Sequence, residues 1–150
     1  QYVTLIDGVQ DPGNLGTIFR TSLGFGMDAV IMGKGTVDPF NPKVVRGSSG
    51  TLLRMPFETR VDLAERITFL QSKGFTVLAT SPHAEEDISD IKLRRKVAFL
   101  IGNEARGADS QYIDMANAAV RIDTSGDLES LNVAVAHGIL AHKVKEARTK

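Results

Sequence analysis

Small and polar residues gather just before the last helix that the sequence predicts. They are Ser125, Gly126, Asp127, Ser130 and Asn132. The first amides of a helix have no hydrogen-bond partner within the helix, so such an entrance can hold a carboxylate, a ribose or a capping side chain. The simpler interpretation is that Ser130 or Asp127 caps the helix. Other parts of the chain must decide between these alternatives.

A second group of polar side chains lies near the start of the chain, in the segment NLGTIFR. It places Asn14, Gly16 and Arg20 on the first turns of a predicted helix. An amide and a guanidinium so close together are candidate binding groups. In the simpler interpretation Asn14 caps this helix and Arg20 is a surface charge.

The segment GNEARG, residues 102–107, follows an apolar strand directly. Its two glycines allow a tight turn and a close approach of the backbone to a ligand. Glu104 could accept a proton or hold a partner arginine. The alternative is a loop in which the glycines only provide positive φ angles.

The remaining motifs give weaker signals. GFGMDA, residues 24–29, spells GxGxxA, but it follows a helix and leads into a strand, which reverses the dinucleotide-binding order. The sequence has no phosphate-binding GxxxxGK[ST] motif, and its three scattered histidines predict no metal site. His137 is more typical of a buried histidine with satisfied hydrogen bonds. KLRRK, residues 92–96, could contact phosphates, although a solvated loop is the simpler interpretation.

Short apolar runs alternate with helical patterns and define the elements that must position these residues. Strands are expected at 2–9, 29–32, 52–58, 75–80, 97–101 and 118–122. Helices are expected after the turn at 11–14, around 44–45, over 62–73 and 109–115, and at the end of the chain. The pattern predicts an α/β fold, a parallel sheet covered by helices on both faces. The last helix is apolar on every side of its first turns, which predicts that it is buried all round.

Ligands of such sheets bind beyond the carboxyl ends of the strands. This rule selects the loops at 11–16, 80–83, 102–107 and 123–130.

Composition limits the class of protein. The chain has 150 residues, of which 42% are hydrophobic and 24% charged, as expected for one globular domain. Its formal net charge is zero, so nucleic-acid binding would depend on local patches. It has no cysteine and no apolar run of about 20 residues, so we expect a soluble, cytoplasmic protein. Because the chain begins with Gln1, we expect it to be a domain of a longer protein.

Three segments, NLGTIFR, FLIGNEARG and IDTSGDLESLNVAVA, resemble the three motifs of the SpoU/TrmH family of SPOUT methyltransferases. KVVRGSSGTLLRMPF, residues 43–57, is also similar to the family's stretch between its first two motifs, so the resemblance covers nearly the whole chain. The chain departs from the family at Asp123-Thr124, where members usually have Pro-Met. This departure concerns the cofactor loop more than the fold.

The resemblance implies an α/β domain with a C-terminal trefoil knot and a pocket for S-adenosylmethionine. It implies a homodimer whose RNA site spans the interface, and methyl transfer to a ribose 2′-hydroxyl without a metal. The RNA is ribosomal RNA or transfer RNA, and the start at Gln1 favours the ribosomal-type members, which often carry an N-terminal RNA-binding domain. By residue match, the cofactor pocket is lined by Thr80, Gly102, Ile122 and Leu131. The reactive cluster is Asn14, Arg20, Glu104, Ser130 and Asn132.

Family accounts make the arginine at the position of Arg20 a base. Because a guanidinium normally stays protonated, we expect Arg20 to clamp a neighbouring phosphate and orient the hydroxyl instead. Asn14 and Glu104 would position Arg20, while Ser130 and Asn132 would hold the ribose or the loop. Two rival interpretations stay open, an NAD- or nucleotide-dependent enzyme and an RNA-binding module without catalysis.

Overall fold

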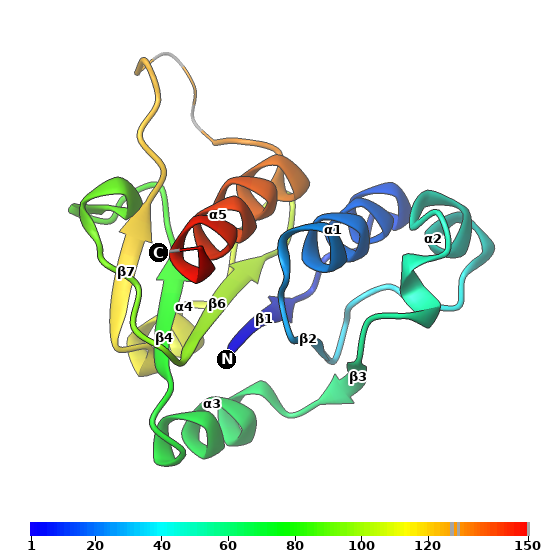
Figure 1. Ribbon diagram of the computed structural model, residues 1–150, viewed down its shortest axis with the longest axis horizontal. Helices are drawn as coiled ribbons and strands as arrows, with labels where there is room; N and C mark the ends of the chain where they lie inside the picture. The colour runs from blue at the N-terminus through cyan, green and yellow to red at the C-terminus, as the bar shows by residue number, and fades with distance from the viewer. Residues whose placement is uncertain (127, 129, 150) are drawn as a thin grey trace.

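A seven-stranded, all-parallel sheet forms the centre of the molecule in the computed structural model, which describes residues 1–126, 128 and 130–149. The strand order is β3-β2-β1-β6-β4-β7-β5 (Figure 1). The strands are β1 (Tyr2–Asp7), β2 (Ala29–Gly33), β3 (Phe57–Val61), β4 (Thr76–Thr80), β5 (Glu86–Asp87), β6 (Val97–Gly102) and β7 (Ala118–Arg121). The predicted α/β class and parallel sheet are therefore confirmed.

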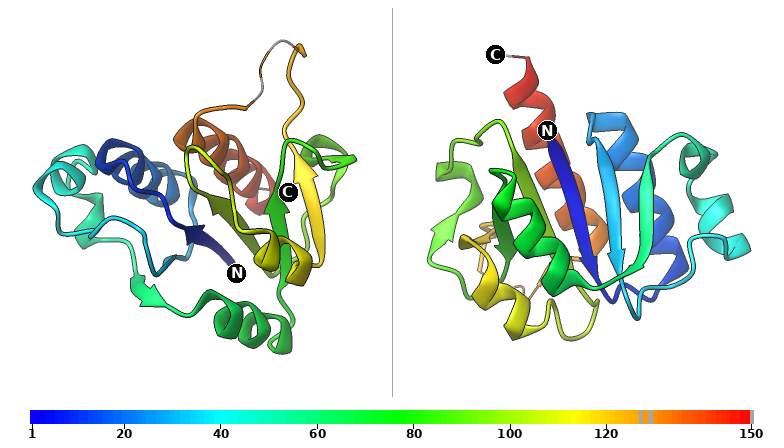
Figure 2. Two further views of the ribbon diagram at one scale, coloured as in Figure 1. Left: turned by 180° about the vertical axis from the view of Figure 1, so that it is seen from behind. Right: turned by 90° about the horizontal axis from the view of Figure 1, so that it is seen from below.

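Helices cover both faces of the sheet (Figure 2). On one face lie α1 (Pro12–Phe25), α2 (Pro42–Gly47) and α5 (Val133–Arg148). On the other lie α3 (Leu63–Ser72) and α4 (Ser110–Met115). The short 3-10 helices are η1 (Thr51–Leu53) and η2 (Ile88–Asp90). Within the part of the chain that the structure describes, none of the helices is long and apolar enough to cross a membrane.

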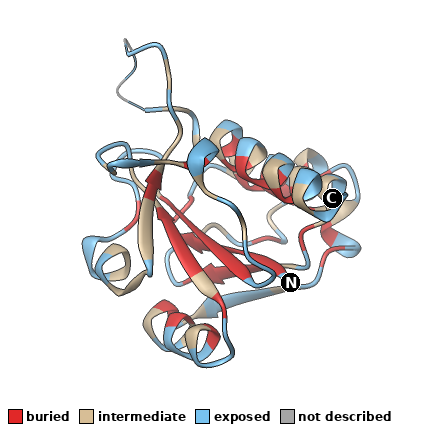
Figure 3. Ribbon diagram, turned by 60° about the vertical axis from the view of Figure 1, so that its left-hand side comes forward, coloured by how far each residue is buried: buried red, intermediate tan, exposed pale blue. Residues whose placement is uncertain are grey.

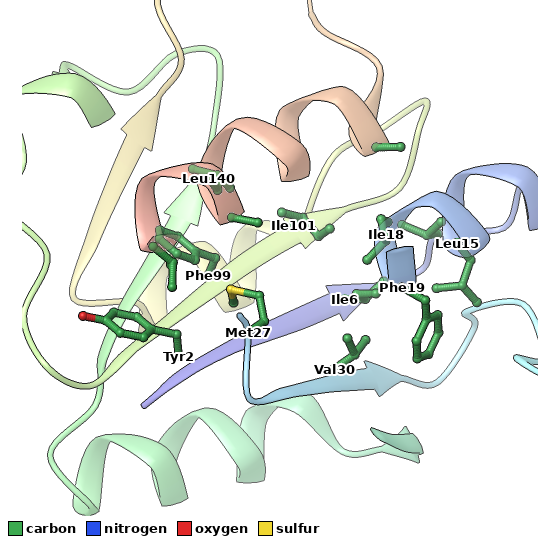
Figure 4. Packing of buried hydrophobic residues seen from close by; sticks show 14 of the residues in the cluster. Tyr2, Ile6, Leu15, Ile18, Phe19, Met27, Val30, Phe99, Ile101 and Leu140 are labelled. Atoms are coloured by element: carbon green, nitrogen blue, oxygen red, sulfur yellow. The ribbon is translucent and has the colours of Figure 1, made fainter. Parts of the chain in front are cut away.

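The core lies on both sides of the central strands β1 and β6, which are buried at all six of their positions (Figure 3). Phe19, Phe99 and Leu140 pack together with the side chains of β1 that face α1 and α5 (Figure 4). Leu5 and Leu100 point to the opposite face, against α3 and α4. Strands buried on both faces explain why the sequence shows continuous apolar runs and no alternation.

Capping side chains set the start of the helices that border the site. Asp11 accepts a hydrogen bond from the amide of Gly13 at 2.8 Å and begins α1. Asp62 accepts a hydrogen bond from the amide of Glu65 at 3.2 Å and begins α3, as the sequence predicts. Asn14, considered above as the cap of the first helix, therefore lies inside α1 instead.

The strand predicted at 52–58 is wrong in its first half. Residues Thr51–Leu53 form η1, and β3 begins only at Phe57. Gly50, at φ 83°, turns the chain into η1, and Pro56 has no amide to donate to a sheet. The carbonyl of Pro56 still accepts the Val30 amide at 3.0 Å, which brings the chain back to the edge of β2.

The prediction that the last helix is buried all round is also wrong. One face of α5, with Ala134, His137 and Leu140, packs on the molecule, but Val135 and Ile139 are 53% and 40% exposed. The pattern of apolar residues shows which side chains favour burial, but it does not show whether other parts of the same chain pack against them.

Helix α5 is capped by neither residue considered from the sequence. Asn132 is the N-cap, and its Oδ1 accepts the amides of Ala134 at 2.8 Å and Val135 at 3.1 Å. Ser130 lies two residues before this cap and is exposed. Asp127 lies outside the described residues.

Candidate functional site at the carboxyl edge of the sheet

The parallel register brings the carboxyl ends of four strands to one edge. Asp7, at the end of β1, pairs with Gly102, at the end of β6, and Thr80, at the end of β4, pairs with Val120 of β7. Helices α1 and α5 both begin at this edge (Figure 1). The loops that the strand-end rule selected therefore share one side of the molecule.

A tight turn after β6 explains the glycine at position 102. A Cβ atom on Gly102 would lie 1.9 Å from the backbone nitrogen of Ala108 and 2.1 Å from the carbonyl carbon of Gly107. The turn is closed by two backbone hydrogen bonds between Asn103 and Gly107, of 3.1 and 2.9 Å. Since backbone atoms cannot move aside as a side chain would, only glycine fits. The sequence predicted a close approach of the backbone to a ligand at this glycine, but the atoms closest to a Cβ position on Gly102 are backbone atoms of Gly107 and Ala108.

Glu104 fastens this turn to the loop between β1 and α1. Its Oε1 accepts the backbone amides of Gln10 at 2.8 Å and Asp11 at 3.0 Å. Asn103 adds a further link by donating from Nδ2 to the carbonyl of Gly8 at 2.8 Å. Glu104 thus acts on the start of α1 through the backbone, and its bonded partners are amides rather than an arginine.

A buried aspartate that the sequence analysis missed completes the connection. Asp7 is 5% exposed, and its Oδ2 accepts the amide of Asp109 at 2.7 Å. The guanidinium of Arg106 lies 3.6 Å from the same oxygen. The available signal was a carboxylate ending an otherwise apolar strand, YVTLID, since a buried charge needs partners.

Asn14 and Asn132 meet across the two helices that begin at this edge. The Nδ2 of Asn132 donates to Oδ1 of Asn14 at 3.1 Å, although the two residues are 118 positions apart. Because the Oδ1 of Asn132 also caps α5, both ends of its amide are used. Glu104 joins this group indirectly, since it holds Asp11, the cap of α1.

Arg20 and Ser130 stand apart from this group. Arg20 is exposed, and among the described residues no hydrogen bond or ion pair involves its guanidinium. It lies six residues beyond Asn14, which corresponds to about 9 Å along α1 and about 120° around it. Ser130 is also exposed. The structure brings Asn14, Glu104 and Asn132 together and leaves Arg20 facing solvent.

The four residues matched to a cofactor pocket all lie at the carboxyl edge. Thr80 ends β4, and its hydroxyl donates to the carbonyl of Leu100 at 3.1 Å. Gly102 ends β6 within the tight turn. Ile122 follows β7 and Leu131 precedes the cap of α5, and both are half-buried. The edge therefore presents backbone groups and half-buried apolar side chains.

A separate hollow of about 260 Å³ lies on the α3 and α4 side of the sheet. Lys34, Asp62, Leu63 and Tyr112 are among the residues that line it. Burial raises the pKa of Tyr112, helped by the nearby carboxylate of Asp7. This hollow is distinct from the meeting point of Asn14 and Asn132, which lies on the α1 and α5 side.

His137 is a core residue, as predicted. It is 1% exposed, and its Nε2 lies 2.9 Å from the hydroxyl of Thr4 while its Nδ1 lies 2.8 Å from that of Thr21. Burial lowers its pKa from 6.5 to about 4, because the charged ring would lose its hydration. The ring is therefore neutral at neutral pH.

The GxGxxA segment closes a helix in the structure. Gly24 and Phe25 end α1, and Gly26, at φ 83°, is its C-cap. A dinucleotide-binding motif opens a helix after a strand, so this segment has the opposite setting. The sequence predicted that this segment follows a helix and leads into a strand, and the structure confirms that order.

Comparison with known proteins matches the chain to a family. Residues 1–142 match the model of the SpoU rRNA Methylase family. The chain is 37% identical over 143 residues to the 23S rRNA (guanosine(2553)-2′-O)-methyltransferase RlmP of Bacillus subtilis, covering 95% of this chain and 57% of that protein. It is 35% identical over 145 residues to the 23S rRNA (guanosine-2′-O-)-methyltransferase RlmB of Xylella fastidiosa, covering 97% and 58%. The chain thus spans about half the length of the curated relatives it matches.

Solved structures agree with this match. The AdoMet-bound rRNA methyltransferase of Sinorhizobium meliloti superposes with a TM-score of 0.91 at 32% identity, over 97% of this chain and 56% of that one. The SpoU methyltransferase AviRb of Streptomyces viridochromogenes, in complex with AdoMet, gives 0.91 at 25% identity, over 99% and 58%. The segments NLGTIFR, FLIGNEARG and IDTSGDLESLNVAVA all lie within the matched residues.

Proposed function

Because this chain belongs to the SpoU rRNA Methylase family, we propose that it transfers the methyl group of S-adenosylmethionine to a ribose 2′-hydroxyl of RNA. Ribosomal RNA is the favoured substrate, since three relatives above 30% identity are named 23S rRNA 2′-O-methyltransferases. Such a substrate would place the protein in the cytoplasm. The observation that carries the proposal is the contact between Asn14 and Asn132, which joins the first and third family segments at the carboxyl edge.

The residues at this edge fit S-adenosylmethionine. Adenosine sites combine apolar surface with a few fixed polar groups. We assign the apolar part to Ile122 and Leu131, which are half-buried, and the backbone part to Gly102 and Thr80. The Thr80 hydroxyl is engaged with Leu100, which supports a role for the Thr80 backbone rather than its side chain. When bound, the cofactor supplies a methyl group activated by a sulfonium.

The reaction requires the ribose oxygen to lie in line with the methyl carbon and to lose its proton, which would pass to solvent water because Arg20 stays protonated. Arg20 stays protonated, so it clamps the neighbouring phosphate with its planar fork and orients the hydroxyl. Glu104 holds the start of α1 through the amides of Gln10 and Asp11 and so fixes the direction from which Arg20 reaches. Ser130 and Asn132 hold the ribose or the loop.

The exposed face of α5 supports a homodimer. Val135 and Ile139 lie one turn apart and are 53% and 40% exposed. A second copy that covers this face would lie beside Asn132, so the RNA site would span the interface. Ile139→Lys is expected to give monomers in sedimentation velocity, because it places a charge in an apolar contact. Leu53→Lys, at an 80% exposed position on η1, is the control and should leave the dimer intact.

We also propose a trefoil knot in the C-terminal part of the chain. Strand β7 lies beyond β4, whereas α5 packs against α1 and β6. The two ends of this connection, Ile122 and Asn132, therefore lie by different strands at the carboxyl edge, which is where the family's knot is expected. A crystal structure with this connection traced would test it, and a connection that passes outside the loop at 103–109 would contradict it.

The length of the relatives supports a larger protein. The chain spans about half of them, so we propose that residues 1–150 are the catalytic domain of a longer chain with an N-terminal RNA-binding domain. The intact mass of the natural protein tests this. A mass equal to that of the 150 residues alone would contradict it.

Binding measurements separate the proposed enzyme from an NAD-dependent one. Titration calorimetry with S-adenosylmethionine, with its demethylated product and with NAD should show binding of the first two ligands only. Binding of NAD alone would overturn the proposal. Binding of none of the three would indicate either a pocket impaired at Asp123-Thr124 or a pocket that depends on the proposed N-terminal domain.

Arg20→Ala separates an active enzyme from an RNA-binding module. The variant should bind S-adenosylmethionine as the wild type does, because Arg20 lies outside the four residues assigned to the cofactor, yet it should transfer no methyl group to a 23S rRNA transcript. Wild-type turnover would remove Arg20 from the mechanism. The same assay with bulk transfer RNA tests the alternative substrate, and transfer to that RNA alone would overturn the ribosomal assignment.

A further inference from the structure

The basic segment KLRRK lies at the edge of the sheet opposite the proposed site. Its Arg94, Arg95 and Lys96 are exposed on the loop that leads into β6. Two exposed cations from other elements lie beside it, Lys73 at the end of α3 and Arg148 at the end of α5. We call these five residues the amino-edge patch.

Specific contacts hold the patch together. The Tyr2 hydroxyl donates to the carbonyl of Arg94 at 2.9 Å, and the guanidinium of Arg148 lies 4.9 Å from the centre of the Tyr2 ring. The Nζ of Lys96 donates to the carbonyl of Lys73 at 2.9 Å. Three segments far apart in the sequence are thus joined, and their charges emerge from an anchored backbone rather than from a loose loop.

The charge of the patch is mostly uncompensated. Arg148 pairs with Asp28 at 2.6 Å. Among residues 1–126, 128 and 130–149, no other ion pair involves a member of the patch. The whole chain has 18 basic and 18 acidic residues, so the patch is a local excess of positive charge in a neutral protein. Such an excess attracts polyanions.

The chemistry of the patch favours RNA over a membrane. The aromatic rings beside it belong to Tyr2 and Phe75, which are 7% and 8% exposed, and to Phe69, which is 52% exposed and whose centre lies 5.6 Å from Nζ of Lys73. One exposed ring beside five cations is much less apolar surface than the apolar helix face that inserts into a bilayer, and such a ring can also stack with a base of RNA. Phosphate groups along a nucleic-acid backbone match this arrangement.

The patch lies far from the proposed reaction. Strand β6 is six residues long, which places the patch about 20 Å from the turn at Gly102. Helix α5 runs in the opposite direction to β6, from Asn132 at the carboxyl edge to Arg148 at the patch, over 16 residues and about 24 Å (Figure 2). A ligand that touches both ends must therefore extend along the length of the domain.

We propose that the amino-edge patch binds backbone phosphates of the RNA substrate away from the nucleotide that is methylated. The inference rests on the proposed function for the identity of the RNA. The patch adds affinity and leaves the chemistry unchanged, because its cations lie about 20 Å from the reactive cluster. It gives the KLRRK segment the phosphate-binding role that the sequence left open.

The test compares two matched double variants of the full chain. Arg94→Ala with Arg95→Ala removes two charges from the patch, and Arg54→Ala with Arg60→Ala removes two exposed charges from the region of β3. Binding of a 23S rRNA transcript is measured by fluorescence anisotropy over a range of salt concentrations. The loss of two phosphate contacts should lower the slope of log Kd against log salt by about 1.5 and weaken binding about tenfold at 0.15 M salt. The control should match the wild type.

Steady-state kinetics provide the second measurement. The patch variant should have a higher KM for the transcript and an unchanged kcat, because the patch binds the RNA equally well in the ground state and in the transition state. An unchanged salt slope, or a loss of the same size in the control, would overturn the patch, as would binding of anionic phosphatidylserine vesicles in place of RNA. Binding is read independently of methyl transfer. A wild-type protein that binds the transcript through the patch but methylates nothing would therefore contradict the proposed function alone.

Discussion

The buried imidazole of His137 makes the stability of this protein depend on pH in a way that one substitution can isolate. The Thr21 hydroxyl can donate to the carbonyl of Thr17 at 3.2 Å, so it accepts from Nδ1–H of His137. Nε2 then accepts from the hydroxyls of Thr4 at 2.9 Å and Ser22 at 3.3 Å. The neutral ring is fully bonded, and protonation would place a charge in the core.

The magnitude follows from the two pKa values. The pKa of His137 is about 4 in the folded protein, against 6.5 for an ordinary histidine. Between these values the unfolded chain binds the extra proton, so stability is complete above pH 6.5 and is lost as the pH falls toward 4. The full difference is about 3 kcal/mol, of which about 2 kcal/mol disappears between pH 7 and pH 5.

The assay is urea unfolding followed by circular dichroism at pH 7 and pH 5. His137→Gln removes the titrating group, so the wild type should lose about 2 kcal/mol more than this variant between the two pH values. The difference between the two proteins cancels the contribution that the carboxylates make to the pH dependence of stability. Glu58, whose pKa is lowered by its hydrogen bond with Arg66, is one of these carboxylates. His142→Gln, at an exposed position, is the control and should behave as the wild type. Equal losses in the wild type and His137→Gln would refute the argument.

Substitutions at three further positions test the carboxyl edge. Gly102→Ala should destabilise the fold by about 3 kcal/mol or more and abolish S-adenosylmethionine binding, because the added methyl meets backbone atoms; Gly24→Ala, in open space on α1, should be neutral or stabilising in the same melts. Asn132→Ala should lower the free energy of unfolding by about 1 kcal/mol, because it removes the cap of α5. Asn132→Asp should keep the cap and lose only the hydrogen bond to Asn14, so it should lower kcat while leaving the stability unchanged. Glu104→Gln should lower kcat with little change in cofactor affinity, and an unchanged kcat would show that the charge of this side chain is dispensable.

The sequence alone determined the α/β class and the segments that carry the proposed chemistry. Strands buried on both faces must be apolar throughout, so β1, β4 and β6 could be recognised from their composition. Local signals were equally clear at Asp62, which caps α3, and at Gly26, which ends α1, because a cap acts on residues within one turn. His137 was recognised as a core residue from its place in an apolar helix.

The tertiary structure decided which distant residues work together. The sheet order brings Asn132 to Asn14 and places Glu104 against the amides of Gln10 and Asp11, and no local pattern encodes contacts over such separations. The contact between Asp7 and Asp109 and the exposed face of α5 were missed for the same reason, whereas the cap of α5 at Asn132 is a local signal that the choice of Ser130 or Asp127 as the cap overlooked. Periodicity reports which side chains avoid water, whereas the three-dimensional packing decides what covers them and which polar groups they bring into contact.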